Sequence, residues 1–276
     1  MLGKLLKHEW KSIGKVPAIL LAVLFVVTIM AGFTFVYPFW ESETVSGAEF
    51  LVIMIWMLFY GVLIGVSVGI SLYLAVHFYK SMYTDEGYLT HTLPVTARQL
   101  LVSKLLPMAG WLYISSVAII LAILLFAGMA VLFARPEGVT LAEFMTPVWT
   151  ELKMAFAELG EQGGAGFMFS MILMVLVSGF SGAMLVIGSV TVGQLVGKHK
   201  ILGSIGAYFV INSITSFVSM IAMIPMMIGN VRDGEVVSAF EILTPSYLVT
   251  TIIMAAISVV LFFVSELIVR KKLNLD

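Results

Sequence analysis

The stretch FLVIMIWMLFYGVLIGVSVGISLYLAVHFY, residues 50–79, runs for thirty positions without an Asp, Glu, Lys or Arg. A helix needs about 20 apolar residues to cross the ~30 Å hydrocarbon core of a bilayer. At about 1.5 Å per residue, a helix of this stretch would be roughly 45 Å long. The stretch therefore predicts a membrane-spanning helix that tilts or projects beyond the bilayer.

The rest of the 276-residue chain is similarly apolar, with 61% hydrophobic residues, 11% charged residues and a mean hydropathy of +1.08. Soluble domains carry about 25% charged residues. We therefore expect an all-α membrane protein, with one transmembrane domain over residues 1–276. Six segments have the length and composition of spans: 16–40, 50–79, 100–134, 166–196, 201–228 and 247–269.

The sequence lacks cysteine, and it lacks the features of a cleavable signal peptide. The chain has no cysteine, which excludes disulfides, thiolate nucleophiles and cysteine-ligated metals. The apolar run 16–40 is too long for the apolar core of a signal peptide, and no A-x-A-like cleavage site follows it. We therefore expect this run to be a retained first span.

The basic residues between the spans predict the orientation. With six spans, twelve basic residues fall on one side and three on the other. Cytoplasmic loops are the ones enriched in Lys and Arg. Both termini, the loop 80–99 and the turn 197–200 are therefore predicted to be cytoplasmic, and the loop 135–165 to lie outside. The first group is Lys4, Lys7, Lys11, Lys15, Lys80, Arg98, Lys104, Lys198, Lys200, Arg270, Lys271 and Lys272; the second is Arg135, Lys153 and Arg232.

Residues 1–15 have the pattern of a short amphipathic helix. Leu2, Leu5, Leu6 and Trp10 recur at helical spacing, although Glu9 interrupts this apolar stripe. The lysines would face anionic lipid, and Trp10 suits the membrane interface. We expect an elbow helix that lies in the membrane plane; a solvated basic lead-in is the alternative.

The longest outer loop, 135–165, holds a second amphipathic pattern. Residues 140–159 alternate between apolar and polar in a helical way, and Gly160, Gly163 and Gly164 follow. The pattern predicts a short helix near the outer surface that ends in a glycine hinge.

The loop 80–99 carries signals for a short helix between two spans. Thr84 and the two acids after it suit a helix start, and Pro94 ends the element. Thr96 and Gln99 then form a capping-box pattern that opens the helix of the third span. Such a short helix would suit the docking of a cytoplasmic partner; an ordinary interfacial loop is the equal alternative.

Few ionisable side chains lie within the spans. Glu266 is expected to pair locally with Arg270 and Lys271, and His77 to lie at the interface. Asn212 and Gln194 are expected to form hydrogen bonds between helices, with ligand contact as the alternative.

No catalytic or metal-binding constellation is apparent. The four histidines lie in separate segments without metal-ligand spacing, and the chain has no P-loop motif. We therefore expect no enzymatic activity, no metal site and no cofactor, and any energy for transport would enter through another chain.

Gly61, Gly65 and Gly69 form a G-x-x-x-G-x-x-x-G stripe in the second span. Glycines at this spacing let helix backbones approach closely. The stripe favours packing within the subunit, or otherwise packing against a second subunit.

Two segments carry a family resemblance. DEGYLTHTLPVTARQLLVSK, residues 85–104, and GQLVGKHKILGSIGAY, residues 193–208, resemble the two cytoplasmic turns of six-span permeases of bacterial ABC-2-type ABC transporters. The resemblance extends in outline over nearly the whole chain and implies a multi-pass protein of the bacterial plasma membrane. In that family the helix between spans two and three, the coupling helix, enters a groove of the ATPase.

The resemblance also implies partners and contact residues. It implies two separate ATP-binding subunits that hold ATP and Mg²⁺, a second permease that is identical or homologous, contact with membrane lipid, and no nucleic acid. The coupling-helix contacts would be Tyr83, Asp85, Glu86, Tyr88, Leu89 and His91, and a second cytoplasmic contact would be Lys198, His199 and Lys200.

Members of the family typically export drugs, antimicrobial peptides, polysaccharide or lipids, and some act in antimicrobial peptide resistance. An ATP-driven exporter of a hydrophobic or amphipathic solute is therefore the expected function. The alternatives are a carrier or channel that works without an ATPase, and a membrane anchor or assembly protein that transports nothing.

Overall fold

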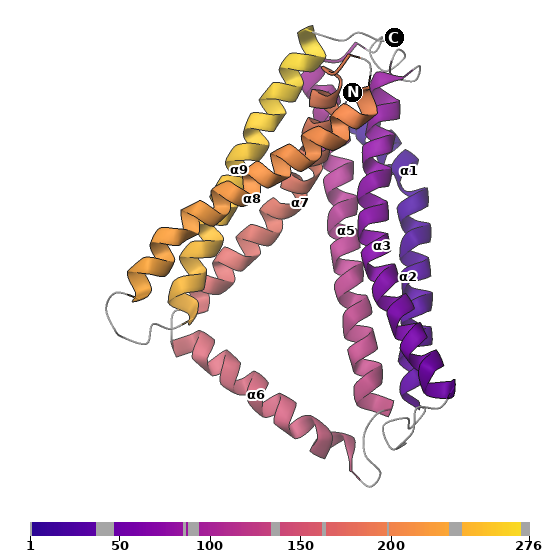
Figure 1. Ribbon diagram of the computed structural model, residues 1–276, viewed down its shortest axis with the longest axis vertical. Coiled ribbons are helices and arrows are strands. Elements are labelled where there is room, and N and C mark those ends of the chain that lie inside the picture. The colour runs from indigo at the N-terminus through magenta and orange to yellow at the C-terminus, as the bar shows by residue number, and fades with distance from the viewer. Residues whose placement is uncertain are drawn as a thin grey trace. The chain divides into compact units, whose positions relative to one another are not determined.

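The computed structural model describes residues 2–36, 47–84, 87, 94–133, 139–161, 164–197, 199–231 and 239–271. Throughout these ranges the regular structure is helical, and no strand occurs in them (Figure 1). The elements are α1 (Leu2–Ile13), α2 (Lys15–Phe33), η1 (Thr34–Val36), α3 (Gly47–Tyr83), α5 (Ala97–Phe133), α6 (Leu141–Glu161), α7 (Gly164–Gly193), α8 (Lys200–Val231) and α9 (Ala239–Lys271).

The six predicted spans are confirmed as helices that are long and apolar enough to cross a membrane. They are α2 with η1, α3, α5, α7, α8 and α9, and the mean hydropathy of their most apolar parts ranges from 1.8 to 2.8. In a helix the backbone N–H and C=O groups form hydrogen bonds with each other, which a lipid environment requires because it offers no water. The chain is therefore an all-α, multi-pass membrane protein.

The predicted start of the third span is confirmed in atomic detail. The backbone N–H of Gln99 donates to Thr96 Oγ1 at 3.3 Å, and the backbone N–H of Thr96 donates to Gln99 Oε1 at 3.2 Å. Each side chain thus satisfies a backbone N–H at the helix start that has no partner in the helix itself. α5 begins at Ala97 for this reason.

The predicted outer helix is present as α6. It also opens with a capping box: Thr140 donates to the Glu143 carboxylate through its backbone N–H at 2.9 Å and through its hydroxyl at 2.8 Å. These two hydrogen bonds, the backbone one first, lower the pKa of Glu143 below its ordinary value. The glycine hinge falls only partly in the described residues, since Gly163 lies outside them.

The chain divides into two compact units, which we describe separately. Unit 1 comprises Met1–Ile13, Tyr73–Leu112 and Ala157–Asp276, and unit 2 comprises Gly14–Leu72 and Tyr113–Phe156. The long helices α3 and α5 each contribute one part to each unit.

Unit 2 is organised around an aromatic cluster from three elements. The ring of Phe126 in α5 stacks on Phe59 of α3 with centroids 4.6 Å apart and contacts Phe35 of η1 at 5.1 Å. Trp56 joins the cluster and donates its indole N–H to Thr34 Oγ1 at 2.8 Å. Burying the polar N–H against a hydroxyl lets this ring pack without an unsatisfied donor.

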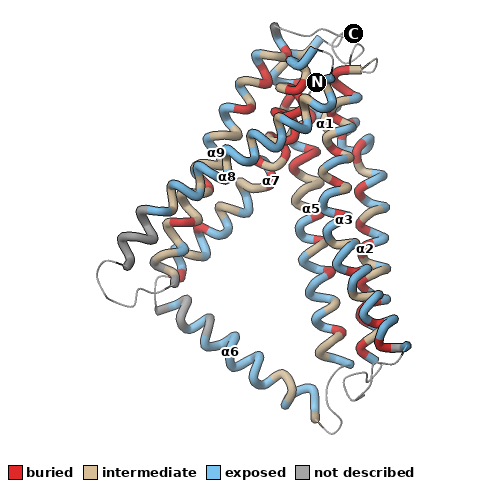
Figure 2. The backbone as a smooth tube through the Cα atoms, in the orientation of Figure 1, coloured by how far each residue is buried: buried red, intermediate tan, exposed pale blue. Residues whose placement is uncertain are grey.

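Unit 1 is centred on α7, which packs against both α8 and α9. Buried residues gather in the second half of α7, whereas α8 is mostly exposed or half-buried (Figure 2). Small residues allow this close packing. A Cβ added to Gly188 would lie 2.9 Å from Leu261 Cδ2 of α9, and one added to Gly193 would lie 2.4 Å from the backbone N of Ser204 in α8.

Candidate functional site

The helix ends that flank the loops predicted to be cytoplasmic are joined by contacts at one end of unit 1. Contacts at this end join α1, the end of α3, the start of α5, the end of α7, the start of α8 and the end of α9. We call this region the polar end. It is built from four groups of contacts.

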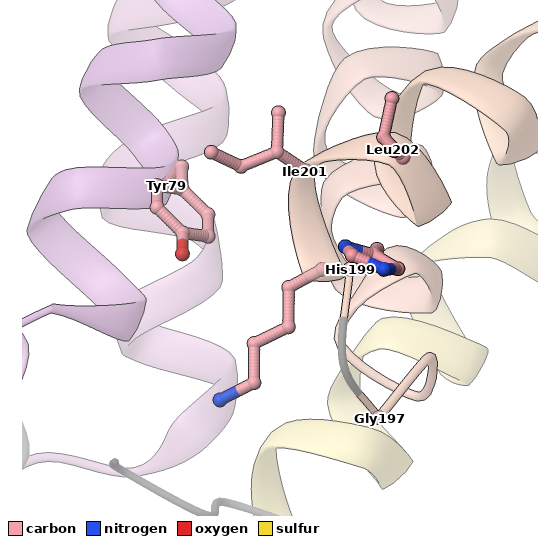
Figure 3. A pocket seen from close by; sticks show the side chains of 6 residues that line it. Tyr79, Gly197, His199, Ile201 and Leu202 are labelled. Atoms are coloured by element: carbon pink, nitrogen blue, oxygen red, sulfur yellow. The ribbon is translucent and has the colours of Figure 1, made fainter.

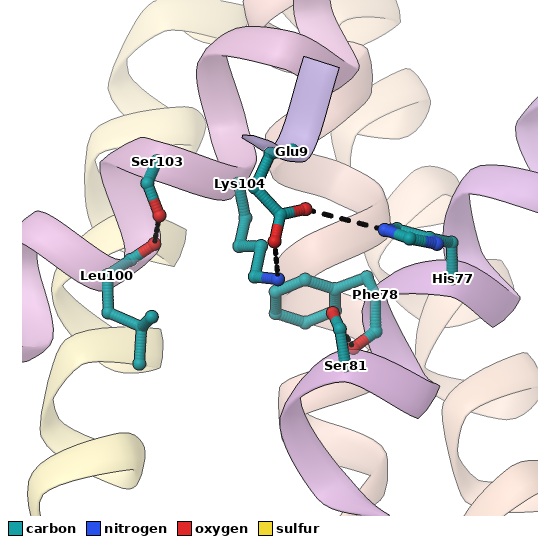
Figure 4. A network of polar contacts seen from close by, with 7 residues as sticks. All are labelled: Glu9, His77, Phe78, Ser81, Leu100, Ser103 and Lys104. Carbon is teal, nitrogen blue, oxygen red and sulfur yellow. Dashed lines mark hydrogen bonds and ion pairs between the residues drawn. The ribbon is translucent and has the colours of Figure 1, made fainter. Parts of the chain in front are cut away.

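The first group centres on Glu9 of α1, whose carboxylate lies between two basic side chains (Figure 4). Lys104 of α5 donates from Nζ to Glu9 Oε1, and His77 Nε2 of α3 lies 3.4 Å from Glu9 Oε2. Lys104 is 3% exposed and Glu9 9% exposed. A single carboxylate therefore joins α1 to both helices that flank the loop 84–96.

The electrostatics of Glu9 follow from this arrangement. Burial on its own would raise the pKa of the carboxyl, because it penalises the charged form. The hydrogen bond with His77 and the charge and hydrogen bond of Lys104 outweigh burial, so that the pKa lies below the ordinary value of 4.5. Glu9 is thus a carboxylate at neutral pH and does not interrupt the helix face as the sequence suggested: it belongs to the buried face of α1.

An aromatic contact holds the same helix from the next position. The rings of Trp10 and Trp111 stack with centroids 5.8 Å apart. A Cβ added to Gly110 would lie 2.5 Å from Trp10 Cζ3 and 2.8 Å from Cη2, so the indole fits only because residue 110 has no side chain. α1 is therefore anchored to α5 by packing as well as by charge. Its in-plane placement on a membrane stays a prediction.

The second group links the start of α5 to α9. Arg98 Nε donates to both carboxylate oxygens of Glu266 at 2.8 Å, and its guanidinium lies 5.9 Å from the Phe263 ring centroid. The expected local partner Arg270 also lies near Glu266, at 3.9 Å. Sequence reasoning found this local pair but missed the closer one, which joins residues 168 positions apart.

The third group ties the last turn of α3 to α7. The Tyr83 hydroxyl donates to Thr191 Oγ1 at 3.1 Å, and both residues are buried. The same helix turn buries Met82, and Ser81 there donates to the backbone carbonyl of Phe78. Tyr83, the first residue of the predicted coupling-helix contact, therefore packs inside unit 1.

The fourth group forms a hollow at the start of α8. A cavity of about 320 Å³ is lined by Tyr79 of α3 together with Gly197, His199, Lys200, Ile201 and Leu202 (Figure 3). The turn before α8 is tight: the N–H of Val196 donates to the carbonyl of Gly193 at 3.1 Å. His199 and Lys200, two of the three residues predicted for a second cytoplasmic contact, are thus placed beside Tyr79.

The other predicted site residues are distributed as follows. Asp85, Glu86, Tyr88, Leu89, His91 and Lys198 lie outside the described residues. Gly61 and Gly65 are exposed, and a Cβ added to either would meet no atom within 4 Å among the described residues; one added to Gly69 would lie 3.6 Å from Leu20 Cδ1. Since 3.6 Å is an ordinary van der Waals distance, close packing among the described residues requires glycine at none of these three positions.

Two polar residues of the spans behave differently from expectation. Gln194 Nε2 donates to the carbonyl of Val190 at 3.2 Å, one turn back in the chain, and no bond from its side chain to another helix is found in the described part of the chain. Asn212 has no hydrogen-bond partner among the described residues. The described ranges also contain no cluster of His, Asp or Glu that could hold a metal ion.

Comparisons with family models, with curated proteins and with solved structures returned no match for this chain.

Proposed function

We propose that the chain is the permease subunit of an ATP-driven ABC transporter that exports a hydrophobic or amphipathic solute. In this proposal ATP is hydrolysed by two separate ATP-binding subunits, which dock on the loop between α3 and α5. A second permease, identical or homologous, completes the pathway across the bacterial plasma membrane. The basic end of this chain lies in the cytoplasm.

The observation that carries the proposal is the bridging position of Glu9. Through His77 and Lys104 it holds the two helices that enter and leave the docking loop. A displacement of the loop would therefore move α1, α3 and α5 together instead of bending one of them. Buried charge pairs of this kind are costly to separate, which suits a rigid transmitter.

Two further contacts fix the flanks of the loop. Tyr83, just before the loop, bonds to Thr191 of α7, and Arg98, just after it, bonds to Glu266 of α9. A push on the loop would reach α7 and α9 by these routes. The motif of residues 85–104 also supports the proposal. So does the scarcity of ionisable residues within the spans, because a chain without them needs a partner such as an ATPase to supply the energy.

The test is co-purification from the native host. Full-length tagged chain is extracted in mild detergent, and the co-purifying proteins are assayed for ATP hydrolysis and for photolabelling by azido-ATP. We expect an ATP-binding protein with the native chain and its loss with Glu86→Arg or Tyr88→Ala. Glu151→Arg, a charge reversal at an exposed position within α6, is the matched control and is expected to retain it.

Two outcomes contradict the proposal in different ways. Retention of the ATPase by both loop variants would remove the docking role of that loop. Absence of any ATP-binding protein with the native chain would favour a carrier, channel or anchor that works without an ATPase.

A further inference from the structure

A second cavity lies within the spanning part of unit 1, among α7, α8 and α9. Its volume is about 240 Å³. Its polar lining consists of Ser178, Ser181, Asn212, Thr215 and Ser258. No Lys, Arg, Asp, Glu or His lines it.

The cavity lies at the same distance along α7 and along α8 from the polar end. Asn212 lies twelve residues after Lys200, the start of α8, and Ser181 lies twelve residues before Gly193, the end of α7. At about 1.5 Å per residue, both are roughly 18 Å along their helices from the polar end. Half of the hydrocarbon core is about 15 Å. If α7 and α8 cross the bilayer from the polar end, this distance puts the cavity near the middle of the hydrocarbon core.

The hydroxyl groups of the lining already have partners for their protons. Ser178 donates to the carbonyl of Val175 and Thr215 to that of Ile211, each at 2.8 Å. The hydroxyl oxygens of Ser181 and Ser258 lie 2.8 Å apart, and both are within hydrogen-bond distance of the Met254 carbonyl. These groups can still accept hydrogen bonds, but they offer no spare proton.

Asn212 is the exception. Its carboxamide has no hydrogen-bond partner among the described residues, although it lies within a membrane-spanning segment. A primary amide without a partner in hydrocarbon is unfavourable, because it exchanges its hydrogen bonds with water for none. The side chain is also exposed, so a molecule from the membrane can reach it.

We propose that this cavity is a binding site for an uncharged, lipid-like amphiphile that enters from the membrane. Its hydroxyl, ester or amide group bonds to the Asn212 carboxamide, and a hydroxyl or amide N–H can also donate to the serine oxygens. Its apolar body lies against Leu185, Ile257 and Leu261. A charged head group is excluded, since no side chain of opposite charge lines the cavity at a depth where an unpaired charge is costly.

The proposal depends on the spanning character of α7, α8 and α9 and not on ATP or on the docking loop. Loss of the ATPase partner would leave it intact, and loss of this site would leave the docking role intact. The two proposals therefore fail separately.

The test uses the purified full-length chain in phosphatidylcholine nanodiscs with two photoactivatable probes. One is a diacylglycerol with a diazirine in its acyl chain, and the other is a phosphatidic acid with the same acyl chains. Labelled peptides are identified by mass spectrometry. We expect the diacylglycerol to label the cavity-lining segments of α7, α8 and α9, and the phosphatidic acid to label them much less.

Variants assign the labelling to the amide. Asn212→Leu is expected to reduce labelling by about fivefold, which corresponds to one lost hydrogen bond, and Asn212→Gln, which retains the carboxamide, to preserve most of it. Ser213→Leu changes the neighbouring residue of α8, which does not line the cavity, and is the matched control. Ser178→Leu fills the cavity without changing Asn212 and should also reduce labelling.

Three results would overturn the proposal. They are equal labelling by the two probes, unchanged labelling in both Asn212→Leu and Ser178→Leu, and a rapid disulfide between two copies of Asn212→Cys. The last result is unambiguous because the chain has no other cysteine, and it would show that a second copy of α8 occupies the site.

Discussion

Lys104 of α5 bonds to the Glu9 carboxylate of α1 across 95 positions of sequence, and both side chains are buried. Lys104 has Glu9 as its ion-pair partner, and Glu9 has Lys104 together with the hydrogen bond to His77. Desolvation of such a pair cancels much of its attraction, but a lone buried charge is far worse. The contact therefore determines where α1 lies more strongly than it adds net stability.

Replacing one member of this pair should destabilise the chain more than replacing both. Glu9→Leu or Lys104→Leu leaves one buried charge without its partner, at a cost of about 3–5 kcal/mol. The double variant leaves neither, so its unfolding temperature should lie closer to that of the native chain than either single variant. The measurement is thermal unfolding in detergent for all four proteins. Additive losses in the double variant would show that the two residues act independently.

Acidification should weaken the same contact. Burial raises the pKa of Glu9, but His77 and Lys104 together lower it by more than burial raises it. The pKa in the folded chain therefore lies below the unfolded value of about 4.5. The stabilisation is therefore fully present above the unfolded value and is lost as pH falls through the folded value. Between about pH 6 and pH 3, the native chain should lose more thermal stability than Glu9→Gln, which has no carboxyl to protonate. Equal losses would exclude this role of Glu9.

The spans were predictable because a bilayer requires long apolar runs, and the starts of α5 and α6 because capping depends on residues three positions apart. The ends of helices were less predictable. α3 continues to Tyr83, four residues beyond the predicted span, because Met82 and Tyr83 find buried places in unit 1. α9 begins at Ala239, before the predicted start at 247, where Phe240 packs on Phe167 with ring centroids 5.4 Å apart.

The polar contacts of the site were not predictable from local sequence. The bonds from Glu9 to His77 and from Arg98 to Glu266 join residues 68 and 168 positions apart. Only one feature of the sequence indicated that Glu9 has a partner elsewhere in the chain. It is an acid on the apolar stripe of an amphipathic helix. A buried carboxylate needs a cation, but the sequence did not indicate which of the basic residues would supply it.

Residue 110 should tolerate no side chain while Trp10 is present. Gly110→Ala would bring a Cβ within 2.5 Å of the indole, so we expect α1 to be displaced and the unfolding temperature to fall. Gly128→Ala is the control in the same helix, because a Cβ there meets no described atom within 4 Å; removal of glycine from a helix should even stabilise it, by about 0.5–1 kcal/mol. Combining Gly110→Ala with Trp10→Leu should restore part of the loss. Without that recovery, the indole is not the obstacle.

The orientation of the chain can be tested with single cysteines, since the native chain has none. We expect a cysteine at His91 to react with a membrane-impermeant maleimide only after the cells are opened, and a cysteine at Thr150 to react in intact cells. Thr150 is exposed on α6, so accessibility should not limit its labelling. The reverse pattern would place the loop between α3 and α5 outside the cell, where no ATPase could dock.

The Arg98–Glu266 contact should matter more for coupling than for stability. The Arg98 side chain is 63% exposed, whereas the Glu266 carboxylate is buried and also has Arg270 at 3.9 Å. Because Arg98→Gln keeps a hydrogen-bond donor beside Glu266 and leaves Arg270 in place, we expect only a small fall in the unfolding temperature. The pair nevertheless connects the first turn after the docking loop to α9. If that turn transmits movement, Arg98→Glu should retain the bound ATPase but lower solute export, and Arg98→Glu with Glu266→Arg should restore export. Unchanged export in Arg98→Glu would exclude this route, and Thr191→Val, which removes the acceptor of Tyr83, would then test the remaining route through α7.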